Sequence, residues 1–159
     1  KNGHRKIGII CGLPDSLHTQ NRLLGYQKAL YDSAILYNPN LVMYGNWERE
    51  SGYNLCGPLV EKGVTAIFCN NDEMACGAID YCNEHGIFVG KDLSIVGFDN
   101  REIGEVVRPK LSTVSLPLFE IGQKATEIIL SMISGTYSSK EHHLRIECSV
   151  IERDSVCRI

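Results

Sequence analysis

The sequence has no apolar run long enough to cross a membrane and no excess of positive charge. Its longest apolar runs, such as residues 7–11 and 128–130, fall far short of the roughly 20 residues that a membrane helix needs. The formal net charge is −3, so the chain carries no basic surface of the kind that binds nucleic acid. We therefore expect no membrane association, and any DNA binding belongs to a part of the protein outside these residues.

The common catalytic and nucleotide-binding motifs are also missing. There is no G-x-S-x-G nucleophile elbow and no GxxxxGK[ST] phosphate loop, and residues 8–12, GIICG, do not match G-x-G-x-x-G. His18 lies near Asp15 and Ser16, but three such residues in one short loop resemble a catalytic triad only in composition. A small α/β enzyme that uses Asp99 and His18 stays open as the weakest alternative.

The cysteines do not form a disulfide or metal-binding pattern. There are seven, none of them in a CxxC pair, and most lie inside apolar segments. This is typical of buried free thiols in a reducing compartment, so we expect a cytoplasmic protein. The pair His142-His143 has no cysteine at zinc-ligand spacing. We expect no metal and no cofactor.

Short apolar runs alternate with segments of helical periodicity along the 159 residues. The pattern predicts strands at 7–11, 41–44, 65–69, 93–98, 111–115 and 144–150, and helices at 21–34, 49–62, 73–85 and 118–134. Gly63 is expected to end the second helix as a C-cap. Strand–helix alternation with short connectors predicts an α/β fold, a doubly wound parallel sheet flanked by helices.

Ligands of open parallel sheets bind at the carboxyl ends of the strands. Four predicted loops leave strands at that edge: residues 12–16, 45–47, 70–72 and 98–100. Together with the first helix they bring Arg22, Trp47, Asn71 and Asp99 to one crevice. A cation, an aromatic plate, an amide and a carboxylate suit a polyhydroxylated or heterocyclic small molecule.

Each of these residues also has a purely structural interpretation. Asp72 is expected to cap a helix, and the structural alternative for Asn71 is a turn residue. Arg22 has the alternative of pairing with Asp15 or Asp99, and an isolated tryptophan such as Trp47 is more often a core residue. Asp99 is the hardest to explain structurally, because a carboxylate that follows a buried strand needs partners.

Several segments resemble motifs of the LacI/GalR family of bacterial transcription regulators. Residues 70–78, NNDEMACGA, resemble its NDxMAxGA motif, and residues 94–100, SIVGFDN, resemble SVVGFDD. The likeness extends to 3–7 (GHRKI), 22–26 (RLLGY), 109–114 (PKLSTV), 121–125 (IGQKA) and 150–155 (VIERDS). Periplasmic sugar-binding proteins share some of these motifs but usually lack the Gly-His opening and the Arg-x-Ser close.

The resemblance implies a periplasmic-binding-protein-like type I fold, mainly one subdomain of it, and no enzymatic activity. It implies effector contacts at Arg22, Asn71 and Asp99, with Trp47 at the aromatic position and with Ser16 and His18 in the loop that sets effector preference. It further implies a sugar or purine-like effector and a homodimer formed through residues 74–83 and the segment after Asp99. A transport receptor of the periplasmic kind is the alternative.

The same resemblance implies that the chain is the C-terminal part of an effector-binding domain. A helix-turn-helix that binds operator DNA and a first subdomain are then expected outside it. The helix at 118–134 is expected to belong to that other subdomain. Residues 144–150 are then expected to return the chain to the present subdomain. We expect this helix to pack here against a second copy or against an exposed face of the sheet.

Overall fold

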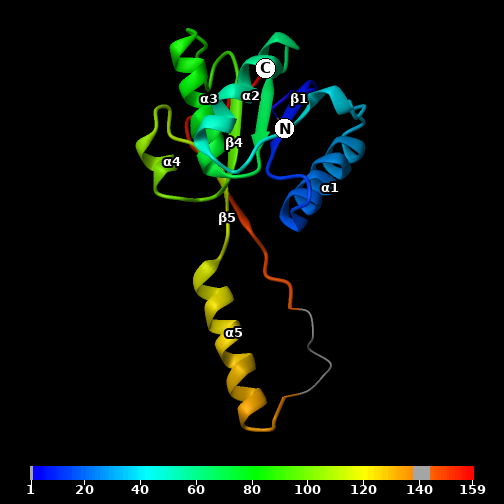
Figure 1. Ribbon diagram of the computed structural model, residues 1–159, viewed down its shortest axis with the longest axis vertical. Helices are drawn as coiled ribbons and strands as arrows, with labels where there is room; N and C mark the ends of the chain where they lie inside the picture. Colours follow the sequence, from blue (N-terminus) through cyan, green and yellow to red (C-terminus); the bar gives the residue numbers. More distant parts are fainter. Residues whose placement is uncertain (1, 138–143) are drawn as a thin grey trace.

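The computed structural model describes residues 2–137 and 144–159, and it confirms a doubly wound α/β fold (Figure 1). One six-stranded sheet has the order β2-β1-β3-β4-β5-β6, parallel except for the last pair. The strands are β1 (Ile7–Cys11), β2 (Val42–Tyr44), β3 (Ala66–Cys69), β4 (Ser94–Asp99), β5 (Ser112–Ser115) and β6 (Ser149–Ile151). The helices are α1 (Leu17–Asp32), α2 (Arg49–Glu61), α3 (Asp72–Glu84), α4 (Ile103–Val106), α5 (Leu118–Ile133) and the 3₁₀ turn η1 (Pro39–Leu41).

The helices cover the two faces of the sheet unequally. On one face, α2 and α3 bury the larger core, which includes Ile10, Ile67 and Ile95. On the other face α1 packs Tyr26 and Leu30 against β1. Apolar runs such as IGIIC in β1 form strands here because both of their faces are buried.

Helices α2 and α3 pack closely because glycines lie at their contact. A Cβ added to Gly77 would lie 1.9 Å from the carbonyl oxygen of Arg49. One added to Gly52 would lie 2.0 Å from the carbonyl oxygen of Met74. Helix α2 ends as predicted, with Gly63 just beyond it at a φ of 71°.

The cysteines match the prediction of free thiols. All seven are unpaired, and five of them are buried. Burial raises the pKa of the Cys11 thiol to about 12, which keeps it protonated at neutral pH. The histidine pair at 142–143 lies outside the described residues.

Some boundaries differ from the predicted ones. Helix α1 begins at Leu17 rather than at residue 21, since Ser16 already has the extended conformation of an N-cap. The short helix α4 and the turn η1 were not predicted. The last strand is confined to Ser149–Ile151, because only these residues reach the edge of β5.

Helix α5 forms where it was predicted, but it projects away from the sheet (Figure 1). None of its residues is buried, and Phe119 and Ile133 are 86% and 78% exposed. The expectation that it packs on an open face of the sheet is therefore wrong. The chain leaves the sheet before α5 and returns to it after α5 at one point, since Ser115 pairs with Ser149. Packing against a second copy stays a prediction.

Candidate functional site

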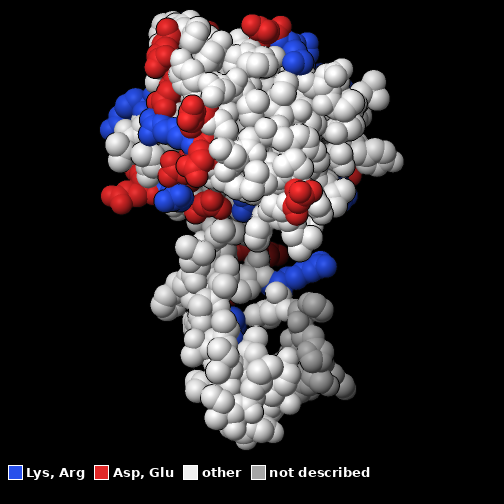
Figure 2. All heavy atoms as spheres, in the orientation of Figure 1, with Lys and Arg blue, Asp and Glu red and all other residues white. Residues whose placement is uncertain are grey.

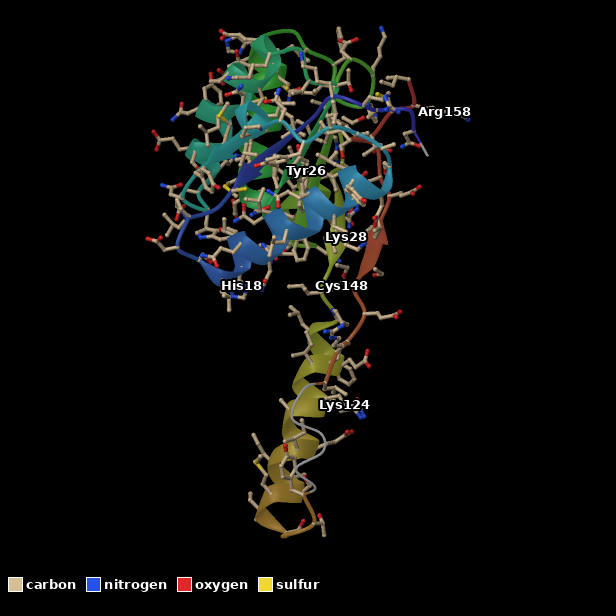
Figure 3. All side chains as sticks on the ribbon, turned by 90° about the vertical axis from the view of Figure 1, so that its right-hand side faces the viewer. His18, Tyr26, Lys28, Lys124, Cys148 and Arg158 are labelled. Carbon is tan, nitrogen blue, oxygen red and sulfur yellow. The ribbon has the colours of Figure 1, made fainter. Side chains whose placement is uncertain are left out.

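The carboxyl ends of β1, β2, β3 and β4 form the edge of the sheet that faces α5. The start of α1 lies at this edge, where Figure 3 labels His18, and Cys148 of the returning segment lies nearby. The sequence-predicted residues divide here into a central pair, Arg22 and Asp99, and a set that supports or surrounds it.

Arg22 lies in the second turn of α1, not in the first as predicted, because that helix begins earlier. Its guanidinium donates hydrogen bonds to the carbonyl oxygen of Asn70 and, at 3.4 Å, to Oδ1 of Asp99. Burial lowers the pKa of Arg22 and the Asp99 carboxylate opposes that shift. An arginine keeps its charge in proteins, so the site contains a fixed cation.

Two aromatic rings flank this cation. The guanidinium carbon lies 3.8 Å from the ring centroid of Phe98 and 5.7 Å from that of Trp47. Both distances fall within the range of cation–π attraction. Trp47 itself lies against Gly12, where an added Cβ would be 2.1 Å from the indole ring. Position 12 therefore has to be glycine for the indole to occupy this place.

Asp99 ends β4 in an unusual backbone conformation. Its φ is 110°, and Asn100 follows with a φ of 56°. Non-glycine residues adopt such angles rarely, at a cost of about 1–3 kcal/mol, and they cluster at functional sites. Burial raises the pKa of Asp99, an effect that Arg22 opposes. The turn thus places a partly desolvated carboxylate beside a cation.

Asn71 and Asp72 hold the start of α3. Oδ1 of Asn71 accepts from the backbone N–H of Met74 at 2.9 Å, and its Nδ2 donates to the carbonyl of Trp47 at 2.8 Å. Asn71 is therefore the helix cap, the role predicted for Asp72. Asp72 is buried and accepts from Thr113 Oγ1 and the N–H of Arg101, both at 2.6 Å. Burial raises the pKa of Asp72, and these two hydrogen bonds oppose that shift.

Ser16 and His18 lie at the beginning of α1 rather than in a free loop. Ser16 is half-buried at the N-cap position, and His18 is exposed in the first turn. Across residues 2–137 and 144–159, no hydrogen bond joins His18 to Asp15, Ser16 or Asp99. The alternative pairing of Arg22 with Asp15 does not occur, since Arg22 pairs with Asp99.

A groove of about 580 Å³ continues from the site along the flank of the sheet that α1 leaves open. Arg22 and Phe98 belong to both the site and this groove. The sequence prediction did not include Phe98, although it directly precedes Asp99 in the GFD segment. The rest of the lining is largely apolar: Asn21, Gly25, Tyr26, Ala29, Phe68 and Val96.

Two negative findings apply to the part of the chain that the structure describes. It contains no group of three or more His, Cys, Asp or Glu side chains placed to hold a metal ion. It also contains no helix with the length and apolar character needed to span a bilayer.

The chain is similar to a known domain family, to characterised relatives and to solved structures. The model of the periplasmic binding protein-like domain matches residues 1–156. The HTH-type transcriptional repressor PurR of Haemophilus influenzae is 36% identical over 158 residues, which cover 97% of this chain and 47% of that protein. The chain thus spans about half the length of this relative.

Solved structures agree with the sequence comparison. A sugar-binding transcriptional regulator of the LacI family from Escherichia coli, complexed with phosphate, has a TM-score of 0.91 and 32% identity over 99% of this chain and 57% of its own. The lac repressor dimer bound to operator and the anti-inducer ONPF has a TM-score of 0.88 and 28% identity, covering 98% of this chain and 54% of its own. These relatives are transcriptional regulators, not enzymes.

Proposed function

Because this chain belongs to the periplasmic binding protein-like family, in the form found in LacI/GalR regulators, we propose that it is the C-terminal subdomain of the effector-binding domain of such a regulator. The observation that carries this proposal is the Arg22–Asp99 pair at the strand edge, with the Arg22 guanidinium close to the rings of Phe98 and Trp47. A cation, a carboxylate and two aromatic rings in one place suit a small molecule with a flat face and several hydroxyl or ring N–H groups.

The effector is a sugar or a purine-like molecule. Asp99 accepts hydrogen bonds from it, Arg22 donates to it, and Trp47 and Phe98 cover its faces. Asn71 contributes through the loop that it braces, and Ser16 and His18 at the start of α1 set the preference among effectors. The sugar-binding regulator among the relatives supports the sugar class.

A second subdomain completes the site in the full-length protein. Helix α5, with its uncovered apolar side chains, belongs to that subdomain, and the chain crosses to it after Ser115 and returns at Ser149. On the face that Figure 2 shows, most of the visible charged side chains lie on the sheet domain and few lie on α5. Effector binding between the two subdomains shifts the protein between DNA-competent and DNA-incompetent forms.

The regulator acts as a cytoplasmic homodimer. Within residues 74–83 of α3, the side chains that are not buried in the core are those of Asp80, Tyr81 and Asn83. These and the segment after Asp99, which includes α4, form the dimer contact. A helix-turn-helix outside this chain binds operator DNA. The operator-bound dimer of the lac repressor relative supports this arrangement, and the buried free thiols suit a reducing compartment.

The native gene upstream of this chain provides the first test. A helix-turn-helix roughly 160 residues upstream, about one domain and a small module away, supports the regulator. A signal peptide there would instead favour the alternative, a periplasmic sugar receptor. The second test measures binding of the full-length protein to its own promoter DNA by fluorescence anisotropy, with and without hexoses, cellobiose, nucleosides or purine bases. One of these classes should change the DNA affinity, and an affinity that none of them changes would contradict the proposal.

A further inference from the structure

The closing motif of the chain, residues 150–155, lies against the turn that carries Asp99. Ser155 is fully buried and joins two strands: its Oγ donates to the carbonyl of Ile95 at 2.6 Å and accepts from the N–H of Ser112 at 2.8 Å. Two residues earlier, the N–H of Arg153 donates to Oγ of Ser112 at 2.8 Å. The backbone of Arg153 is thereby fixed beside β5.

The Arg153 side chain reaches from this fixed point to the turn after β4. Its Nη2 donates to Oδ1 of Asn100 at 2.8 Å, and its Nη1 donates to the carbonyl of Leu111 at 2.6 Å. The same Nη2 lies 2.5 Å from Oε1 of Glu105 in α4. Only 11% of the Arg153 side chain is exposed. A planar guanidinium satisfies acceptors in several directions at once, which a lysine ammonium on a flexible stem does not reproduce.

The turn that Arg153 holds needs external support. Both Asp99 and Asn100 have positive φ, and such conformations persist only where surrounding contacts enforce them. Asp72 holds the other side of the turn through the N–H of Arg101 at 2.6 Å. The strained residues therefore lie between two buried or nearly buried side chains, Asp72 and Arg153.

We propose that Arg153 is a positioning residue for the effector site, one that fixes the Asp99–Asn100 turn and links it to α4. This inference rests on the proposed function in so far as Asp99 contacts the effector. The contact of Arg153 with Glu105 connects the turn to α4. Helix α4 follows the turn directly in the sequence and lies in the segment proposed for the dimer contact. A change at Asp99 thus reaches α4 through the side chains of Asn100, Arg153 and Glu105.

Hydrogen exchange of the turn amides in the full-length protein tests the first part without any ligand. Arg153→Lys keeps the positive charge and the alkyl stem, so the fold is retained, but it loses the planar fork. We expect exchange at the N–H groups of Asn100 and Arg101 to become at least about tenfold faster. Arg158→Lys, at an exposed position in the same terminal segment, should leave both rates unchanged. Unchanged rates in Arg153→Lys would overturn the proposal.

A double-mutant cycle tests whether the effect reaches the effector. The probes are hexoses, cellobiose, nucleosides and purine bases, titrated calorimetrically into wild type, Arg153→Lys, Asp99→Asn and the double variant. Arg153→Lys should weaken binding at least about tenfold in the wild-type background and have little effect once Asp99 is asparagine. Equal losses in both backgrounds, or no loss, would overturn the positioning role. If no probe binds wild type, the proposed function fails, and the exchange rates still decide whether Arg153 holds the turn.

Discussion

At the scale of single residues, the candidate site depends on the charge of Asp99 and on what surrounds it. The Asp99 side chain is 28% exposed and that of Arg22 17%. Partial burial raises the pKa of Asp99, while Arg22 and, more weakly, Arg101 and His18 counteract the shift. The carboxylate thus protonates at a higher pH than an ordinary aspartate, whose pKa is about 3.9.

This shift predicts a pH dependence of effector binding. The ionised form accepts hydrogen bonds with both oxygens, and protonation removes the charge and part of that capacity. Because the pKa of Asp99 is raised, the affinity for the effector should fall as the pH is lowered, and this fall should begin at a higher pH than it would with an ordinary aspartate. Calorimetric titrations between pH 7.5 and 4.5 measure this affinity. Asp99→Asn should bind more weakly with a flatter profile, and parallel profiles would contradict the prediction.

At the scale of the elements, the contact between α2 and α3 closes the larger core. The same contact positions the start of α3 at the site. Gly52 and Gly77 allow the two backbones to approach, and Asn71 and Asp72 then meet Trp47 and Thr113. Across the helices, Arg49 donates to both carboxylate oxygens of Asp80 at 2.6 and 2.8 Å. The position of the site therefore depends on how α2 packs against α3, on the face of the sheet opposite α1.

A pair of glycine substitutions tests whether the close approach of α2 and α3 stabilises the fold. Gly77→Ala places a methyl group 1.9 Å from the Arg49 carbonyl, and we expect a loss of about 2–3 kcal/mol in the free energy of unfolding from overpacking. Gly25→Ala in α1 meets nothing within 4 Å and should be neutral or stabilising by up to about 1 kcal/mol. Urea denaturation of both variants measures these changes. Equal stabilities would show that the close approach is unimportant.

The order and type of the main elements could be predicted from the sequence because each is set by local periodicity. The grouping of Arg22, Trp47, Asn71 and Asp99 followed from the strand-edge rule. The stacking of Arg22 on Phe98 and the contact of Arg153 with Asn100 could not be predicted. They depend on side chains that lie 76 and 53 positions apart and meet only once the sheet has formed.

At the scale of the whole molecule, the chain consists of a sheet domain and an excursion, residues 116–148, that leaves and re-enters at one point. Leu118, Phe119 and Ile133 on α5 are all at least 67% exposed. A helix with an uncovered apolar face gains little stability on its own, since most helical stability in proteins comes from packing. We therefore infer that α5 adds nothing to the stability of the sheet domain.

Removing the excursion tests this division. Ser115 and Ser149 lie opposite each other in the antiparallel pair, so an Asn-Gly dipeptide in place of residues 116–148 closes a hairpin with a favourable two-residue turn. The shortened chain should unfold cooperatively in urea and bind less of the dye ANS than the 159-residue chain. Loss of cooperative unfolding would show that α5 supports the sheet domain after all.

The central claim is that the Arg22–Asp99 pair binds a small-molecule effector, and calorimetric titration of the full-length protein tests it most directly. Hexoses, cellobiose, nucleosides and purine bases are titrated into wild type, Asp99→Asn and the control Asp154→Asn, which changes an exposed aspartate near Arg153. We predict that one class binds wild type and the control equally. Asp99→Asn should bind it at least about tenfold more weakly, since a hydrogen bond to a charged group contributes about 1.5–3 kcal/mol. Equal binding to wild type and Asp99→Asn, or no binding by any class, would contradict the claim.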